Sequence, residues 1–269
     1  MKMLDGKIIA EKILQNVKKE IQKKNLKPKA GIVCVSINPA AKIYLQKKKE
    51  AAKKTGIDLQ IFDLQNQSEN EIISQIQKLN QDSKYCGILI QLPLPKKFDT
   101  LKILSFIDES KDIDGLAAAA NNHFSKNNFI SPTALSVIEI LNYYLKNWQN
   151  NTIIIIGRGL LVGLPLLYLM RRDKVKKLIS IDENSKNKSA KVQKADILIS
   201  ATGKAGLIKT DQIKKSAVLI DCGSPKPEIN QKDINQKAKM ITPVPGGIGP
   251  LSVAILMQNI LKAAKRLDR

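Results

Sequence analysis

A chain of 269 residues, 43% of them hydrophobic, is long enough to bury a substantial core and to form two domains. His123 is the only histidine, which excludes a multi-histidine metal site, so we predict no metal cofactor and an ordinary surface position for His123. The three cysteines lie far apart in apolar segments and form no CxxC pair, which is typical of core residues in a reduced, cytoplasmic protein: Cys34, Cys86 and Cys222.

The formal net charge of +21 would suit a nucleic-acid partner, but the kind of basic residue argues against one. Only five of the 45 basic residues are arginines, and aromatic residues make up 4% of the chain. Proteins that bind nucleic acid favour arginine forks and aromatic platforms. We therefore do not expect a nucleic-acid partner, although a positive surface would attract an anionic substrate.

Charges interrupt the N-terminal sequence MKMLDGKIIAEK throughout, so we expect no export signal and a cytoplasmic location. The longest apolar stretch, residues 152–170, contains Arg158, Pro165 and three glycines. These interruptions favour a buried strand, a turn and a helix over a membrane span.

Strands and helices alternate along the chain, which predicts an α/β protein with largely parallel sheets. The first half is predicted to contain three strands, at residues 31–37, 57–62 and 86–91. Helices are predicted around them, at residues 6–24, 39–55, 68–79 and 100–107.

A polar segment at residues 121–128 and a connecting helix at residues 132–148 lead into a second predicted sheet. Its strands are expected at residues 152–156, 177–181, 197–200, 217–221 and 239–242. The last helix begins at Pro250 and is expected to return to the first domain. The prediction is therefore one α/β domain from residues 1–119 and 250–269, and a Rossmann-like parallel-sheet domain from residues 120–249.

The second predicted domain carries the pattern of a dinucleotide site. Its first strand, TIIII, leads into a turn that contains Gly157, Gly159 and Gly163, and a helix follows whose N-terminal amides could face a pyrophosphate. Asp182 closes the next strand, where an acid can accept hydrogen bonds from a ribose. The turn alone could be purely structural, but strand, turn, helix and acid together favour binding of NAD or NADP.

The first predicted domain carries residues suited to acid–base chemistry. Tyr44 and Lys48 are four residues apart on one helix, so their side chains project from the same face. Gln91 stands at the carboxyl end of a strand, before Leu92-Pro93-Leu94-Pro95, where open α/β sheets place ligands. Asp114 lies in the loop KDIDG, whose glycine lets the backbone turn beside the carboxylate. Taken singly, each of these features is more typical of a solvated surface or a turn.

Residues 241–259, ITPVPGGIGPLSVAILMQN, join a rigid loop to an apolar helix. Pro243 and Pro245 fix φ, while Gly246 and Gly247 remove side chains where a flat ligand could lie against the backbone. This combination is suited to forming one wall of a ligand site.

These motifs resemble those of the bifunctional methylenetetrahydrofolate dehydrogenase/methenyltetrahydrofolate cyclohydrolase family. The family's YxxxK, QLPLP, KDxDG and PVPGGIGP motifs occur here in the expected order and cover the chain almost end to end. Its motif Gly-Arg-Ser-x-x-Val-Gly-x-Pro is also present, with Gly159 in place of the serine.

The resemblance implies two domains with a cleft between them and two activities on one folate. The enzyme would oxidise 5,10-methylenetetrahydrofolate with NAD(P)⁺ and hydrolyse the methenyl product to 10-formyltetrahydrofolate. Lys48 would transfer the proton during hydration, Gln91 would hold the lysine or the water, and Tyr44 would orient the folate. Asp114 would accept hydrogen bonds from the pterin, and the other folate contacts would be Pro245, Gly246 and Gly247. The resemblance also implies a homodimer and a folate substrate with or without a polyglutamate tail.

The residues expected to bind the cofactor come from five segments of the second domain: Gly157, Arg158, Gly159, Val162, Gly163, Asp182, Glu183, Thr202, Gly203 and Ser224. Asp182 and Glu183 would accept from a ribose hydroxyl and repel a 2′-phosphate, whereas Arg158 would attract one. The two acids tip the balance towards NAD.

Several cofactor-side positions depart from the family pattern. Where the family usually continues with aromatic, histidine or proline residues after KDxDG, this chain has Leu116 followed by four alanines. The strand end usually written DVGINR is Asp221-Cys222-Gly223-Ser224 here. Two alternatives therefore stay open: a cyclohydrolase with weakened or lost dehydrogenase activity, and a non-catalytic relative associated with nucleic acid.

Overall fold

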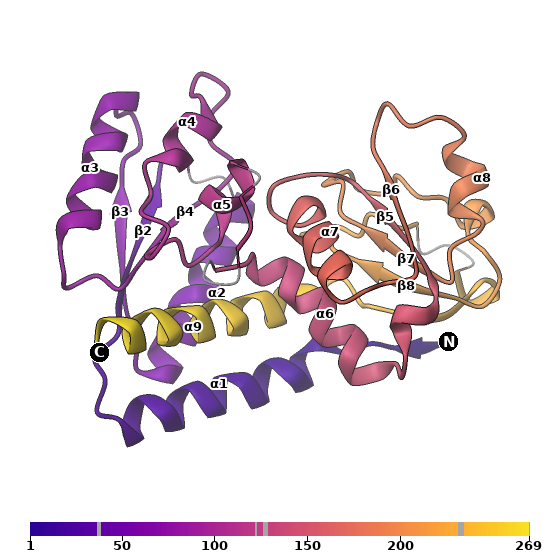
Figure 1. Ribbon diagram of the computed structural model, residues 1–269, viewed down its shortest axis with the longest axis horizontal. Coiled ribbons are helices and arrows are strands. Elements are labelled where there is room, and N and C mark those ends of the chain that lie inside the picture. The colour runs from indigo at the N-terminus through magenta and orange to yellow at the C-terminus, as the bar shows by residue number, and fades with distance from the viewer. Residues whose placement is uncertain (37–38, 122, 126–128, 231–233, 269) are drawn as a thin grey trace. The chain divides into compact units, whose positions relative to one another are not determined.

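The computed structural model describes residues 1–36, 39–121, 123–125, 129–230 and 234–268 (Figure 1). The chain forms two compact units. The six-stranded unit comprises Met1–Ala10 and Thr133–Ser252, and the three-stranded unit comprises Glu11–Pro132 and Val253–Arg269. Each unit is built from segments far apart in the sequence, because helices α1 (Gly6–Lys23) and α9 (Ile248–Leu267) each contribute residues to both.

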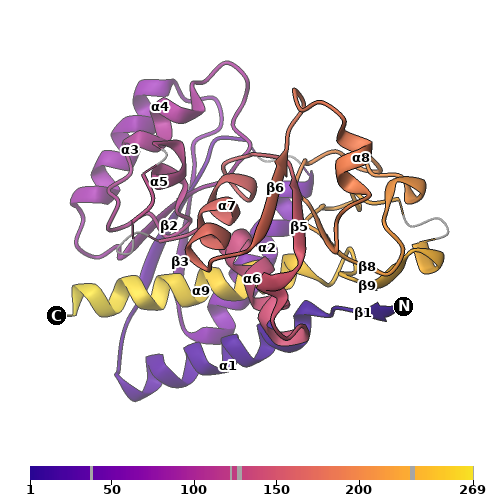
Figure 2. The same ribbon diagram turned by 45° about the vertical axis from the view of Figure 1, so that its right-hand side comes forward.

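The six-stranded unit is built on one parallel sheet with the strand order β1-β9-β8-β7-β5-β6, seen in Figure 2. Isoleucine, valine and leucine dominate the central strands, as expected for a sheet covered on both faces. The strands are Lys2–Met3 (β1), Thr152–Ile156 (β5), Lys177–Ile181 (β6), Ile197–Ser200 (β7), Ala217–Asp221 (β8) and Ala238–Ile241 (β9).

Helices and short 3-10 turns connect these strands. Helix α7 packs on β5 and β6, and Val192 of α8 lies in a core with Ile154, Leu198 and Leu219 from the sheet. The connecting elements are α6 (Pro132–Tyr144), η1 (Trp148–Asn150), α7 (Gly163–Arg172), α8 (Lys188–Val192), η2 (Thr210–Gln212) and η3 (Ile234–Gln236).

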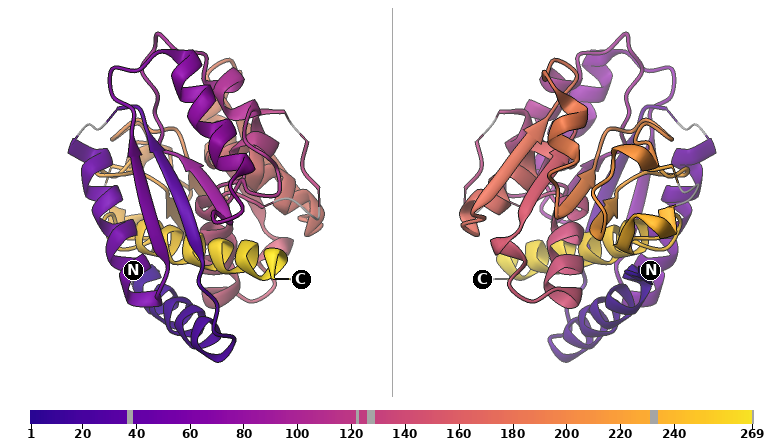
Figure 3. Two further views of the ribbon diagram at one scale, coloured as in Figure 1. Left: turned by 90° about the vertical axis from the view of Figure 1, so that its left-hand side faces the viewer. Right: turned by 90° about the vertical axis from the view of Figure 1, so that its right-hand side faces the viewer.

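The three-stranded unit contains a parallel sheet with the order β3-β2-β4 (Figure 3, left). Its strands are Lys29–Cys34 (β2), Asp58–Asp63 (β3) and Gly87–Ile90 (β4). Its core joins side chains from α1, β2, α2 and α9, including Val17, Ile32, Leu45 and Met257. The helices that belong wholly to this unit are α2 (Pro39–Thr55), α3 (Glu69–Gln81), α4 (Thr100–Ser105) and α5 (Leu116–Ala120).

The structure confirms the predicted α/β class and places most predicted elements within a few residues, with local differences. The strand predicted at residues 31–37 ends at Cys34, and Ile37 and Asn38 lie outside the described residues. The helix predicted at 132–148 stops at Tyr144, because Asn147 turns the chain with a φ of 51° into η1. The helix predicted at 100–107 likewise ends early, at Ser105.

The division into units also differs from the predicted boundaries at the N-terminus. Residues 1–10 belong to the six-stranded unit, because β1 pairs with β9 through Lys2 and Met3. Two residues of strand are too few to show a periodicity in the sequence. Within the described part of the chain, no helix is both long and apolar enough to cross a membrane.

Candidate active site

Lys48 and Gln91 meet at one end of the three-stranded sheet. Lys48 lies in the middle of α2, and its Nζ donates a hydrogen bond of 3.0 Å to Oε1 of Gln91. Gln91 directly follows β4, and its Nε2 donates to the carbonyl of Leu92 at 2.9 Å. Since the amide group is held at its nitrogen, its oxygen is fixed towards the lysine. The predicted pairing of the two residues is therefore present in the fold.

Asp114 is brought to the same place by the loop Lys111–Gly115. The backbone of Asp112 forms a parallel bridge with Ile88 of β4, so the loop runs beside the strand that Gln91 follows. From the other side, Asn259 of α9 donates to the carbonyl oxygens of Ile113 at 2.8 Å and Ile130 at 3.3 Å. Gly115 turns the loop with a φ of 66°. These contacts hold Asp114 close enough to Lys48 for the two charges to interact.

The electrostatics of this pair are governed by burial. Removal from water lowers the pKa of Lys48, and the negative charge of Asp114 opposes that shift. Removal from water raises the pKa of Asp114, and Lys48 opposes that shift in turn. Lys47 and Lys49 are exposed on other faces of α2, where solvent screens their charges. A lysine with a lowered pKa can lose its proton more readily and can then act as a base.

Tyr44 lies one helical turn before Lys48 on α2 and is half-buried. The Nζ of Lys47 is 5.9 Å from the centre of its ring, a cation–π distance. Tyr44 thus presents an aromatic ring on the face of α2 that carries Lys48.

Two residues of the KDIDG loop have roles that the sequence did not reveal. Lys111 is 7% exposed, and its Nζ donates to three carbonyl oxygens at the end of α3, those of Leu79 at 3.0 Å, Asn80 at 2.7 Å and Asp82 at 2.9 Å. It closes that helix end and belongs to the scaffold. Asp112 is 2% exposed and accepts from the backbone nitrogen of Ala117 at 2.8 Å, which fixes the start of α5.

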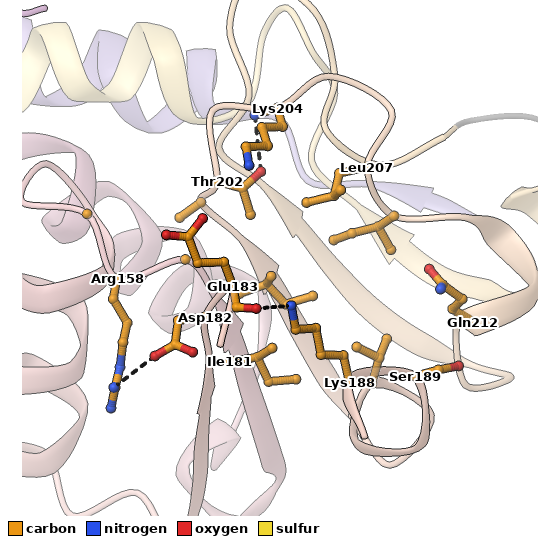
Figure 4. Close-up of a pocket in the computed structure, with 16 residues that line it drawn as sticks. Arg158, Ile181, Asp182, Glu183, Lys188, Ser189, Thr202, Lys204, Leu207 and Gln212 are labelled. Carbon is orange, nitrogen blue, oxygen red and sulfur yellow. Dashed lines mark hydrogen bonds and ion pairs between the residues drawn. The ribbon is translucent and has the colours of Figure 1, made fainter. Parts of the chain in front are cut away.

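The six-stranded unit contains a cavity of about 530 Å³ at the carboxyl ends of β5, β6 and β7 (Figure 4). Apolar side chains form much of its wall, among them Ile156, Ile181, Val192, Leu207 and Ile208. Six of the predicted cofactor residues also line it: Gly157, Arg158, Gly159, Asp182, Glu183 and Thr202. An apolar slot with polar groups at the strand ends suits the adenosine part of a dinucleotide.

The glycine turn is shaped by close backbone contacts. A Cβ atom on Gly157 would come within 2.1 Å of the carbonyl oxygen of Ala201, and one on Gly163 within 2.1 Å of the carbonyl oxygen of Gly157. A Cβ on Gly159 would meet nothing within 4 Å, so this residue faces open space. Gly157 and Gly163 are therefore required for packing, whereas Gly159 leaves the cavity wall bare.

Arg158 and Asp182 form an ion pair at the cavity wall. Nη1 of Arg158 is 3.1 Å from Oδ2 of Asp182, and its Nε donates to Oγ of Ser180 at 3.0 Å. Oδ1 of Asp182 accepts from Oγ of Ser185 at 2.8 Å. These hydrogen bonds, with Ser185 contributing most, lower the pKa of Asp182. Two lysines that no sequence motif marks, Lys188 and Lys204, also line the cavity.

Four predicted cofactor residues do not line this cavity: Val162, Gly163, Gly203 and Ser224. Val162 and Gly163 form the start of α7. The backbone nitrogen of Gly203 donates to the buried Glu228 at 2.8 Å, a contact that no sequence pattern indicated.

The loop Pro243–Gly247 packs against the beginning of the chain. The backbone nitrogen of Gly6 donates to the carbonyl oxygen of Gly246 at 3.1 Å, and a Cβ atom on Gly6 would come within 1.9 Å of the carbonyl oxygen of Gly247. The loop itself is closed by a hydrogen bond of 2.7 Å from the nitrogen of Gly247 to the oxygen of Pro243. The predicted folate-binding loop is therefore a compact turn braced by the N-terminal segment.

Comparison with known proteins gives a family for this arrangement. Residues 4–114 match the catalytic domain of tetrahydrofolate dehydrogenase/cyclohydrolase, and residues 131–268 match the NAD(P)-binding domain of the same family. The chain belongs to the tetrahydrofolate dehydrogenase/cyclohydrolase family. The resemblance drawn from the sequence motifs is thus confirmed.

Members of this family match the chain over nearly its whole length. It is 36% identical to the bifunctional protein FolD of Lactobacillus helveticus over 277 residues, which cover 98% of each chain. A crystal structure of the bifunctional FolD enzyme from Campylobacter jejuni matches with a TM-score of 0.90 and 29% identity, covering 99% of each chain. The Trypanosoma brucei FolD structure, complexed with NADP cofactor and inhibitor, has a TM-score of 0.90 and 26% identity over 99% of this chain and 98% of that one.

Proposed function

We propose that this chain oxidises 5,10-methylenetetrahydrofolate to 5,10-methenyltetrahydrofolate with NAD(P)⁺ and hydrolyses the product to 10-formyltetrahydrofolate. The observation that carries the proposal is the contact between Lys48 and Gln91, beside Asp114, in a chain that belongs to this family. A lysine with a depressed pKa, held by an amide oxygen, is suited to proton transfer during hydration of a cation.

Hydrolysis adds water to the methenyl carbon and then breaks the bond between that carbon and N5, which gains a proton. In the addition, a carbon–oxygen bond forms, the π electrons of the C=N⁺ bond move to nitrogen, and the water loses a proton. Lys48 in its neutral form accepts that proton at Nζ. Gln91 Oε1 takes one N–H of the amine, which leaves the nitrogen lone pair directed elsewhere, towards the water. The positive charge of the substrate lowers the pKa of Lys48 further, so a larger fraction of the lysine is neutral and able to accept a proton when the substrate is bound.

Folate recognition is assigned to a carboxylate, an aromatic ring and a glycine-containing loop. The Asp114 carboxylate accepts from the amino and ring N–H groups of the pterin, because two oxygens match a flat edge with two donors. Tyr44 stacks on the folate or orients it. Pro245, Gly246 and Gly247 offer bare backbone to a flat ligand.

The cavity at the ends of β5, β6 and β7 fits a nicotinamide dinucleotide. Gly159 leaves the wall open, the apolar side chains suit an adenine, and the carboxylate of Asp182 can accept from a ribose hydroxyl. When bound, the cofactor supplies the hydride acceptor for the oxidation. The other proposed contacts are Gly157, Arg158, Val162, Gly163, Glu183, Thr202, Gly203 and Ser224.

The chain uses NAD at least as well as NADP. Support comes from the ion pair of Arg158 with Asp182, because Asp182 neutralises the arginine charge that would otherwise attract a 2′-phosphate. The carboxylates of Asp182 and Glu183 repel a group that carries nearly two negative charges. Lys188 and Lys204 act in the opposite direction, so the preference is modest.

One purified sample tests the proposed activities. Methenyl formation from methylenetetrahydrofolate and hydrolysis of added methenyltetrahydrofolate are each followed spectrophotometrically. We expect both activities. Hydrolysis without oxidation would instead identify a cyclohydrolase that has lost its dehydrogenase.

Steady-state kinetics with both dinucleotides test the cofactor preference. We expect a kcat/KM for NAD at least equal to that for NADP, and Asp182→Ser should move the ratio towards NADP because it removes the repelling charge and frees Arg158. A wild-type kcat/KM for NADP more than about tenfold above that for NAD would contradict the preference.

The protein is a cytoplasmic homodimer in this proposal, and its substrate is a folate with or without a polyglutamate tail. Light scattering of the purified chain tests the dimer, for which a mass near that of one chain is the contrary result.

A further inference from the structure

A buried glutamate holds the turn that follows β7. Glu228 lies in the segment after β8 and is 2% exposed. One of its oxygens, Oε2, accepts from the nitrogen of Thr202 at 2.8 Å, from the hydroxyl of Thr202 at 2.8 Å and from the hydroxyl of Ser200. The other, Oε1, accepts from the nitrogen of Gly203 at 2.8 Å. Four donors of the segment Ser200–Gly203 therefore converge on one carboxylate.

The same turn forms part of the cavity wall. Ala201 and Thr202 line the cavity, as does Lys204 directly after the turn (Figure 4). The carbonyl of Ala201 lies against Gly157, since a Cβ atom there would come within 2.1 Å of its oxygen. A displacement of the turn would therefore alter both the wall of the cavity and the backbone contact of the glycine turn.

Glu228 is itself fixed by a second buried carboxylate. Asp221, at the end of β8 and fully buried, accepts from the backbone nitrogens of Gly223 at 2.8 Å, Glu228 at 3.2 Å and Ile229 at 2.9 Å. The turn after β7 is thus anchored to the sheet through two acidic side chains in series. A network this completely hydrogen-bonded has little freedom to move.

We infer that Glu228 is a positioning residue for the dinucleotide: it fixes the turn Ser200–Gly203 in the shape that the cavity needs, and the hydration reaction does not depend on it. Because Glu228 draws the N–H groups of Thr202 and Gly203 inward, the turn faces the cavity with Ala201 and the remaining surface of Thr202. The inference rests on the proposed role of the cavity as the cofactor site.

The variant Glu228→Gln tests this role with a change of one atom. The amide keeps one oxygen but places an N–H₂ group against a donor of the turn. The side chain can then no longer accept all four hydrogen bonds, and the turn must shift. By calorimetry, we expect the Kd for NAD and for NADP to rise about tenfold or more. Hydrolysis of methenyltetrahydrofolate, measured without dinucleotide, should stay within about twofold of the wild type.

Two further variants make the result specific. Glu139→Gln makes the same chemical change at an exposed position on α6 and should leave the Kd unchanged. Ser200→Ala removes a single donor to Glu228, at a position that does not line the cavity, and should raise the Kd by a smaller factor. If Glu228→Gln does not fold, Ser200→Ala carries the test.

An unchanged Kd in folded Glu228→Gln overturns the inference, and so does a parallel loss of affinity and hydrolysis, which would indicate a general structural role. If the wild type itself binds neither dinucleotide, the assignment of the cavity as the cofactor site fails first. That result is distinguishable, because it appears before any variant is compared.

Discussion

Lys48 combines a pKa lowered by burial with a hydrogen bond from its amine to the side-chain amide oxygen of Gln91. We predict that Lys48→Ala reduces methenyl hydrolysis by at least about a hundredfold while folate and dinucleotide still bind. Because the base must be neutral, the wild-type rate should rise with pH as Lys48 deprotonates, and this rise should disappear in the variant.

Lys47→Ala is the matched control, because its side chain is exposed on a neighbouring face of the same helix. It should keep near-wild-type hydrolysis and the same pH profile. Normal hydrolysis in Lys48→Ala together with loss in Lys47→Ala would reverse the assignment of the base.

Asp114 is expected to act through substrate binding. Asp114→Asn keeps the shape of the side chain but turns one acceptor into a donor that faces the donors of the pterin. Folate affinity should fall by about 1.5–3 kcal/mol, as measured by calorimetry. Unchanged affinity would exclude Asp114 as the pterin anchor. Loss of its charge should also lower the pKa of Lys48 further, because Asp114 opposes the effect of burial there.

At the scale of elements, the loop Lys111–Gly115 makes the stability of the fold depend on pH. Burial raises the pKa of Asp112 from its ordinary value of 3.8 to about 6, and its Oδ1 has no hydrogen-bond partner among the described residues. The folded protein therefore binds the proton of Asp112 more tightly than the unfolded chain does. The contribution of Asp112 to the free energy of unfolding is fully present below about pH 4 and is lost as the pH rises through 6. The difference is about 3 kcal/mol.

Asp112→Asn should remove this dependence, because an amide does not titrate and can still accept from Ala117. Relative to the wild type, the free energy of unfolding of the variant should increase by about 2 kcal/mol between pH 4.5 and pH 7. Urea denaturation at the two pH values measures it. Parallel pH profiles of the two proteins would show that Asp112 does not titrate in this range.

The sequence predicted long, regular elements well and short or context-dependent ones poorly. The strands Thr152–Ile156, Lys177–Ile181, Ile197–Ser200 and Ala217–Asp221 are found as predicted, because runs of β-branched and apolar residues mark buried parallel strands. Helix α5 was missed, since five residues show no helical period, and its start depends on Asp112 from outside the helix.

Residues of the candidate site could be predicted from the sequence only where they belong to a recognisable motif. Lys48, Gln91 and Asp114 stand in such motifs, and the fold brings them together. Lys111 stands in the same motif as Asp114, but only the structure shows that it closes α3. Glu228 follows a Pro-Lys-Pro segment with no recognisable pattern, so its contacts with the turn after β7 could not be foreseen.

At the scale of the whole molecule, both units depend on the end of the chain. The core of the three-stranded unit contains a set of buried side chains from α9: Val253, Leu256, Met257, Ile260, Leu261, Ala263 and Ala264. A chain that ends at Gly249 should therefore fail to fold this unit, and circular dichroism and proteolysis should show it. A chain that ends at Leu267 keeps all of these residues and should fold normally. A protease-resistant fragment 11–132 from the shorter chain would contradict this dependence.

The pairing of β1 with β9 has a consequence for how the protein is made. Lys2 and Met3 are synthesised long before their partners Met240 and Ile241, which come near the other end of the sequence. Neither unit can be completed before the late part of this sequence has been synthesised, because one needs β9 and the other needs α9. At about 5–20 residues per second, the earliest segments wait many seconds with their apolar faces uncovered. Chaperones therefore have this interval in which to bind the nascent chain.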